Sequence, residues 1–115
     1  MNQAQHKPPL LVGCAAGFSG DRIDAAGPVV QELIARAQPA VLIFETLAER
    51  TLALAQLARR SDLNAGFEPL MLDFLRPILA DCLQHGIRIV SNFGAANPDG
   101  AARAIADLAQ QLGLP

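Results

Sequence analysis

The sequence predicts an α/β protein in which a parallel three-stranded sheet is flanked by helices. Three short, continuously apolar segments alternate with segments of helical periodicity, and this order is typical of parallel strands joined by right-handed crossovers. Composition agrees, because 51% of the 115 residues are hydrophobic while Trp and Tyr are absent. A core of Ala, Leu, Ile and Val suits strands that are buried on both faces, as parallel strands usually are.

The first predicted strand covers residues 9–14, an apolar run bounded by prolines and glycines. A helix is then predicted to begin between Asp24 and Pro28, with either Asp24 as its cap or Pro28 at its first position. It should end before Pro39, because the residue that precedes a proline avoids the helical region.

The second predicted strand covers residues 40–44. Thr46 and Glu49 match a capping box, so we expect a helix from Thr46 to about Arg60. Four apolar residues of this segment should face inward: Leu47, Leu54, Ala55 and Ala58.

A third helical segment is predicted over residues 68–83, with a kink or a break into two helices at Pro77. Its apolar stripe is Met71, Phe74, Leu75, Ile78 and Cys82. The third predicted strand covers residues 87–90, and the last helix begins with Asn97 as cap and Pro98 at the first position.

The resulting order is β-α-β-α-α-β-α, and the last helix leads to no further strand. Residues 1–8, which precede the first strand and are mostly polar, should form a flexible tail. Residues 9–115 should form a single, incomplete α/β domain, the first part of a larger doubly wound, Rossmann-like domain. Such a sheet would expose its edges, which a second copy or a partner chain could cover.

Composition excludes several classes of function. The net charge of −2 and a pI near 5.5 argue against nucleic-acid binding. No apolar run approaches the ~20 residues of a membrane span, and residues 1–8 lack the apolar core of a signal peptide. Cys14 and Cys82 have no metal-site spacing, and we expect Cys14 to be a buried thiol. These observations predict a cytoplasmic protein without a metal site; no motif indicates a cofactor.

The carboxyl ends of parallel strands meet at one edge of a sheet, where ligands bind in open α/β folds. A glycine-containing loop follows the first strand there, and its backbone amides could hold the phosphate or carboxylate group of an anionic substrate. Its glycine spacing matches neither a dinucleotide-binding nor a phosphate-loop motif. The alternative is a tight turn with an Asp21–Arg22 salt bridge. The candidate residues of this loop are Gly17, Ser19, Gly20, Asp21 and Arg22.

Glu45 directly follows the second apolar strand. Partial burial would raise the pKa of its carboxyl group, as suits a general acid or base. The alternative is a residue placed before a helix because the helix dipole favours negative charge there.

Polar residues also follow the third strand. Ser91 and Asn92 stand several residues before the next helix, so capping does not explain them, and we expect both to contact the substrate. Asn97 is a further candidate, although capping accounts for most of its role. His85 precedes the strand and should lie at the opposite edge, which disfavours a Ser/His triad.

Three segments resemble, in sequence and order, the start of the acyclic terpene utilization protein AtuA family: residues 13–22 (GCAAGFSGDR), 44–50 (FETLAER) and 89–98 (IVSNFGAANP). The resemblance covers about residues 10–112. It implies a cytoplasmic bacterial protein associated with the breakdown of acyclic terpenes such as citronellol and geraniol through acyl-CoA intermediates. It assigns no catalytic residue, and members of this family are several times longer.

Three functional hypotheses follow. The chain could be part of an enzyme in which Glu45 is the acid/base residue, residues 17–22 bind an anion and Asn92 orients the substrate. It could be a non-catalytic binding or assembly subunit that docks through its uncovered sheet edge. It could also be a truncated product without independent function.

Overall fold

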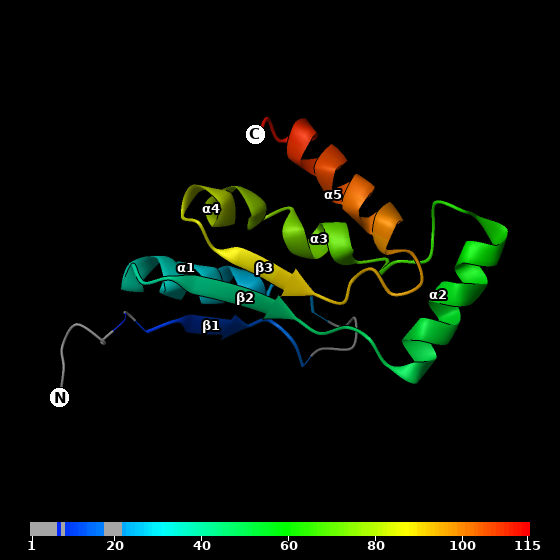
Figure 1. Cartoon of the computed structure of the whole chain (residues 1–115), viewed down its shortest axis with the longest axis horizontal. Helices are drawn as coiled ribbons and strands as arrows, with labels where there is room; N and C mark the ends of the chain where they lie inside the picture. The colour runs from blue at the N-terminus through cyan, green and yellow to red at the C-terminus, as the bar shows by residue number, and fades with distance from the viewer. Residues whose placement is uncertain (1–6, 8, 18–21) are drawn as a thin grey trace.

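The computed structural model describes residues 7, 9–17 and 22–115 (Figure 1). The predicted tail, apart from Lys7 in it, and residues 18–21 lie outside this description. The elements are β1 (Leu11–Cys14), α1 (Ala26–Arg36), β2 (Ala40–Phe44), α2 (Glu49–Ser61), α3 (Met71–Leu75), α4 (Leu79–Gln84), β3 (Arg88–Ser91) and α5 (Pro98–Gln111). The predicted α/β fold with a three-stranded parallel sheet is confirmed.

The strands lie side by side in the order β1-β2-β3, and both neighbouring pairs are parallel. Gly13 lies beside Leu42, and Phe44 lies beside Ser91. All three strands therefore end at the same edge of the sheet, as the sequence predicts.

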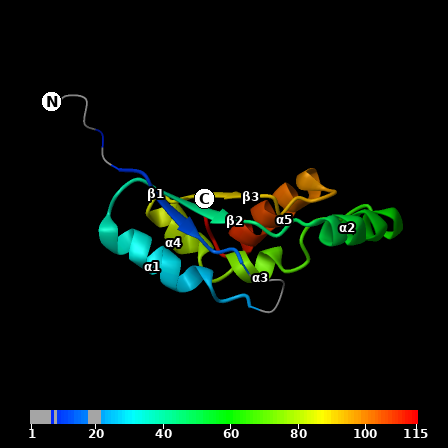
Figure 2. The same ribbon diagram turned by 90° about the horizontal axis from the view of Figure 1, so that it is seen from below.

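The covering helices lie on one face of this sheet. Each strand is added on the same side of the one before it, so right-handed crossovers bring the connecting helices to the same face. Figure 2 shows α1, α3 and α4 on this face. On the opposite face, Val12 is 60% exposed and Val90 56% exposed. The expectation that the strands are buried on both faces is wrong for β1 and β3.

The core lies between the sheet and these helices. The predicted stripe from Met71 to Cys82 is buried throughout, and the chain breaks into α3 and α4 around Pro77, one of the two predicted outcomes. Phe44, Phe74 and Phe93 pack with ring centroids 4.9–5.9 Å apart. This aromatic cluster joins the ends of β2 and β3 to α3.

Two predicted helix caps differ from the structure. Helix α1 begins at Ala26, inside the predicted span from Asp24 to Pro28, but its cap position is Ala25, which has no capping side chain, so neither predicted cap arrangement is correct. The predicted capping box from Thr46 to Glu49 is also wrong, because α2 begins only at Glu49. Instead, the hydroxyl oxygen of Thr51 accepts a hydrogen bond of 2.6 Å from the backbone amide of Ala48, the residue before the helix.

Helix α2 lies beyond the carboxyl ends of the strands rather than on the sheet (Figure 1). Of its predicted inward-facing residues, Ala55 is buried whereas Leu54 is 52% exposed. The helical periodicity identified an apolar side of α2 but not the structure that this side contacts.

The two cysteines lie in different surroundings. Cys14, expected to be buried, is exposed at the end of β1, because its side of the sheet is uncovered. Cys82 is buried in α4, and this burial raises the pKa of its thiol to about 11. None of the helices described here has the length and apolar character needed to cross a membrane.

Gly13 allows α1 to pack closely on β1. A Cβ at this position would lie 2.6 Å from Val29 Cγ1 and 3.0 Å from Leu33 Cδ1. We expect Gly13→Ala to lower the free energy of unfolding by about 1–3 kcal/mol, because the two side chains must shift. Urea denaturation followed by circular dichroism measures this loss.

Gly27→Ala is the matched control, since a Cβ there meets nothing within 4 Å. In the helix it should raise the free energy of unfolding by roughly 0.5–1 kcal/mol. Equal effects of the two substitutions would contradict the role of Gly13 in packing.

Candidate functional site

Hydrogen bonds join the ends of β2 and β3 through Glu45 and Asn92. Asn92 Nδ2 donates to Glu45 Oε1 at 3.0 Å, and Asn92 Oδ1 accepts the Thr46 amide at 3.0 Å. The Leu47 amide also donates to Glu45 Oε1, at 2.8 Å. The structure thus brings together two of the predicted site residues, and their side chains fix the chain that leaves β2.

The carboxyl group of Glu45 is exposed, and its pKa lies below the ordinary value. The hydrogen bond from Asn92 is the main cause and the Leu47 amide the second, since both stabilise the charged form. The expected rise in the pKa of Glu45 is therefore wrong. At neutral pH this group is a carboxylate, which accepts hydrogen bonds and cannot act as a general acid.

The predicted residue Ser91 takes part in a local turn. Its Oγ accepts the Phe93 amide at 3.0 Å, and the side chain is exposed at the end of β3. His85 precedes β3 at the other end of the strand, as predicted. The structure therefore places no imidazole from this residue beside the Ser91 hydroxyl.

Asn97 caps α5 and is only 3% exposed. Its Oδ1 accepts the Gly100 amide at 3.0 Å, and its Nδ2 donates to the carbonyls of Leu63 at 3.1 Å and Ala65 at 2.9 Å. The predicted cap is confirmed. Because the amide is buried and bonded within the protein, we assign Asn97 to positioning the loops rather than to ligand contact.

Further bonds hold the segment before α3 along the segment after β3. The Ala96 amide donates to the Gly66 carbonyl, and the Glu68 amide donates to the Phe93 carbonyl, both at 2.8 Å. From the last turn of α2, Arg59 donates to the Ala96 carbonyl at 2.6 Å. These contacts keep α2 beside the strand ends.

A cavity of about 230 Å³ lies between α2 and the strand-end loops, and we call it the α2 pocket. Its apolar lining residues are Leu47, Leu54, Ala55, Ala58, Phe67, Pro69 and Ala95, and its polar ones are Thr46, Thr51 and Glu68. The residues expected to face the core from α2 thus line this pocket. The sequence did not identify Phe67 and Pro69 as residues of a pocket. Its only indication was that both are apolar and lie at the start of a predicted helix.

The loop after β1 is described only in part. Gly17 is exposed with φ +100°, a conformation that favours glycine. Ser19, Gly20 and Asp21 lie outside the described residues, and so does the predicted Asp21–Arg22 pair. Arg22 Nε donates to Asp24 Oδ1 at 2.6 Å, and this bond lowers the pKa of Asp24. Within the described parts of the chain, no group of three His, Cys, Asp or Glu residues is placed to hold a metal ion.

We expect Asn97→Ala to lower the free energy of unfolding by about 1–3 kcal/mol, because it removes a helix cap and two hydrogen bonds to partly buried carbonyl groups. Chemical denaturation measures the change. Asn64→Ala is the control: Asn64 is exposed and bonds through its backbone amide. It should change the free energy by less than about 0.5 kcal/mol, and a similar loss in both variants would contradict the role of Asn97.

Removing Asn92 should raise the pKa of Glu45 toward its ordinary value. NMR titration of the side-chain carboxyl groups in Asn92→Ala measures the shift, and Asp24 should titrate as in the unsubstituted chain. Because the folded-state pKa of Glu45 is lowered, its contribution to stability is present above the unfolded-state pKa and is lost as the pH falls through the folded-state value. An unchanged Glu45 titration would show that Asn92 is not the main cause.

Comparison with known proteins identifies the family. The model of the family described as "Acyclic terpene utilisation family protein AtuA" matches residues 10–115. Searches of curated proteins and of solved structures give no significant match. The matched region includes all three strands and the α2 pocket. This chain belongs to the AtuA family of acyclic terpene utilisation proteins.

Proposed function

We propose that this domain binds a small, mainly apolar metabolite of acyclic terpene breakdown at the carboxyl ends of its strands. The apolar chain would occupy the α2 pocket, and the polar end would face Glu45 and Asn92. The observation that carries the proposal is the position of an apolar pocket directly beside this polar pair: Thr46 and Leu47 line the pocket, and their amides bond to the same two side chains.

The size and lining of the pocket favour a slim, apolar ligand. Its volume of about 230 Å³ is below the ~300–1,000 Å³ typical of drug-sized sites. Membership in the AtuA family relates the chain to acyclic terpene utilisation. A branched hydrocarbon chain of that class suits a pocket lined by Leu54, Phe67 and Pro69.

The charge of the site favours a neutral head group at Glu45. An ionised carboxylate accepts a hydrogen bond from a hydroxyl group and repels another carboxylate. Glu68 adds a second carboxyl group to the pocket lining. An anionic ligand such as an acyl-CoA would instead direct its charge toward the 17–22 loop, where Arg22 is already paired with Asp24.

The lowered pKa of Glu45 favours binding over acid/base catalysis. General acids and bases work best when their pKa lies near the working pH, and the hydrogen bonds to Glu45 move its pKa in the opposite direction. A non-catalytic binding role is therefore our first choice. An enzymatic role with Glu45 as base is the second, since this carboxylate remains accessible.

NMR titration with geraniol tests the proposal. We expect shifts of the amides that line the pocket, such as those of Leu54, Ala55 and Ala95. Ala58→Phe should fill the pocket and lower the affinity about tenfold, or ~1.4 kcal/mol. Ala53→Phe is the matched control on α2, because Ala53 is exposed and does not line the pocket; it should leave the affinity unchanged.

Parallel titrations with the corresponding carboxylic acid and its coenzyme A ester test the head group. We expect the alcohol to bind more tightly than the acid, and Glu45→Gln to reduce this preference. Tighter binding of the acid or the ester would overturn the neutral head group. Absence of binding by all three compounds would overturn the proposed function.

A further inference from the structure

The face of the sheet opposite α1, α3 and α4 is an uncovered apolar surface. Side chains alternate between the two faces of a strand, and Gly13 on β1 and Leu42 on β2 point toward the helices. The residues of the other face, called the open face here, are Val12, Cys14, Val41, Ile43, Arg88 and Val90. Monomeric proteins rarely leave contiguous apolar patches exposed unless they bind something.

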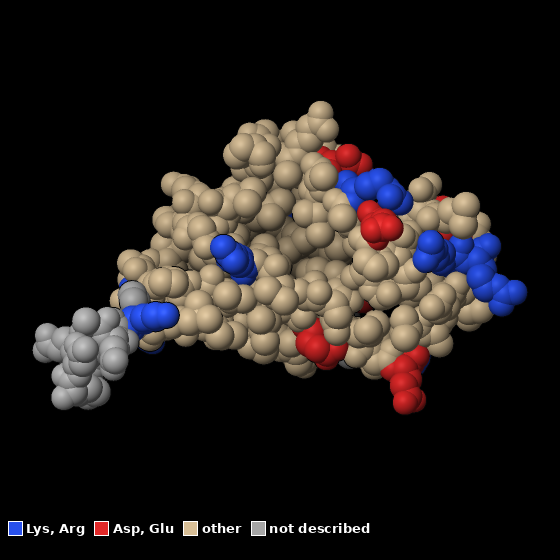
Figure 3. All heavy atoms as spheres, in the orientation of Figure 1, with Lys and Arg blue, Asp and Glu red and all other residues tan. Residues whose placement is uncertain are grey.

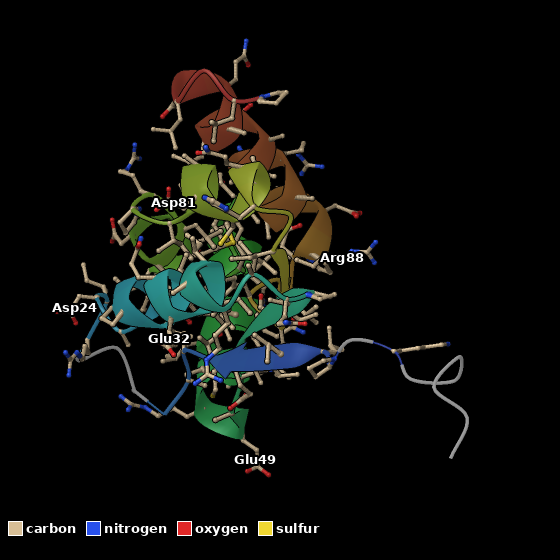
Figure 4. All side chains as sticks on the ribbon, turned by 90° about the vertical axis from the view of Figure 1, so that its left-hand side faces the viewer. Asp24, Glu32, Glu49, Asp81 and Arg88 are labelled. Atoms are coloured by element: carbon tan, nitrogen blue, oxygen red, sulfur yellow. The ribbon has the colours of Figure 1, made fainter. Side chains whose placement is uncertain are left out.

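Charge is unevenly distributed along the open face. Arg88 is its one charged residue, at the amino end of β3. Figure 4 shows that Arg88 projects to the side away from Glu32 and Asp81, which the helices carry. Glu45, exposed just past the other end of β2, continues the row of Val41 and Ile43. Figure 3 shows a surface over the strands that is mostly uncharged.

We propose that the open face binds the open face of a second copy of this chain, in a twofold dimer whose facing strands run antiparallel. In this arrangement the amino end of one sheet lies over the carboxyl end of the other. The twofold axis places each strand over its own copy, so Arg88 on β3 lies at the end of the second copy where Glu45 extends from the neighbouring strand β2, and the axis forms this pair twice. Stacking the sheets with their strands parallel would instead put Arg88 of both copies at the same end, away from Glu45.

The interface would be small. The six open-face side chains and Glu45 of each copy correspond to the low end of the sizes found for specific interfaces, so the dimer should dissociate at micromolar concentrations. The α2 pocket lies beyond the sheet and is not part of this contact, whereas Glu45 belongs both to the contact and to the proposed ligand site, so the dimer is measured without ligand.

Sedimentation velocity and light scattering test the proposal. The protein concentration is varied over about 1–200 μM, a range that suits a small interface. The mass should rise from 12.1 kDa toward twice that value as concentration increases. Val12→Asp and Val90→Asp should hold it at the monomer value. Leu63→Asp is the control, because Leu63 is 77% exposed in the α2–α3 loop, away from the open face. This variant should dimerise like the unsubstituted chain.

A charge exchange provides a second test that leaves the apolar residues intact. Arg88→Glu and Glu45→Arg should each weaken dimerisation about tenfold or more, and the double variant should restore it. Circular dichroism checks that each variant is folded. Because Glu45 also accepts hydrogen bonds from Asn92 and the Leu47 amide, Arg88→Glu, at an exposed residue, decides the matter if an aspartate variant or a Glu45 variant unfolds. A mass of 12.1 kDa at every concentration, an equal effect of Leu63→Asp, or no restoration in the double variant would overturn the proposal.

Discussion

The rest of the structure depends on the direction in which the strands are added. β1, β2 and β3 follow one another across the sheet without reversal, and right-handed crossovers then bring the connecting helices to one face. The core therefore lies between the sheet and α1, α3 and α4, and α5 adds Ala101 and Leu108 to it. The same constraint leaves Val12 and Val90 exposed on the other face and brings all three strand ends to one edge.

The connection from β2 to β3 carries three helices, and α3 and α4 occupy the covered face next to β3. Helix α2 consequently lies past the strand ends, where hydrogen bonds rather than core packing hold it. Asn97 is central to this arrangement, because one buried amide both caps α5 and binds the carbonyls of the segment that follows α2. The α2 pocket is the space left between this helix and the loops.

At the strand ends, Asn92 has a part in both structure and chemistry. Its amide joins the chain after β2 to the chain after β3, and the same contact lowers the pKa of Glu45 by stabilising its charged form. A carboxylate held in this way is a better hydrogen-bond acceptor than proton donor. The site therefore combines an apolar pocket with an accepting group at its border, which is the basis of the binding role that we propose.

The sequence alone determined the features that depend on neighbouring residues: the three apolar strands, an interruption of the helix at Pro77, the Asn97 cap, the buried stripe from Met71 to Cys82 and the edge where the strands end. The tertiary structure decided what covers each surface. Cys14 is exposed, Leu54 lines a pocket and Glu45 has a lowered pKa, all against expectation, because burial and hydrogen bonding at these positions depend on segments distant in the chain. Periodicity shows which side of an element is apolar, but only the packed fold determines which partner, if any, covers that side.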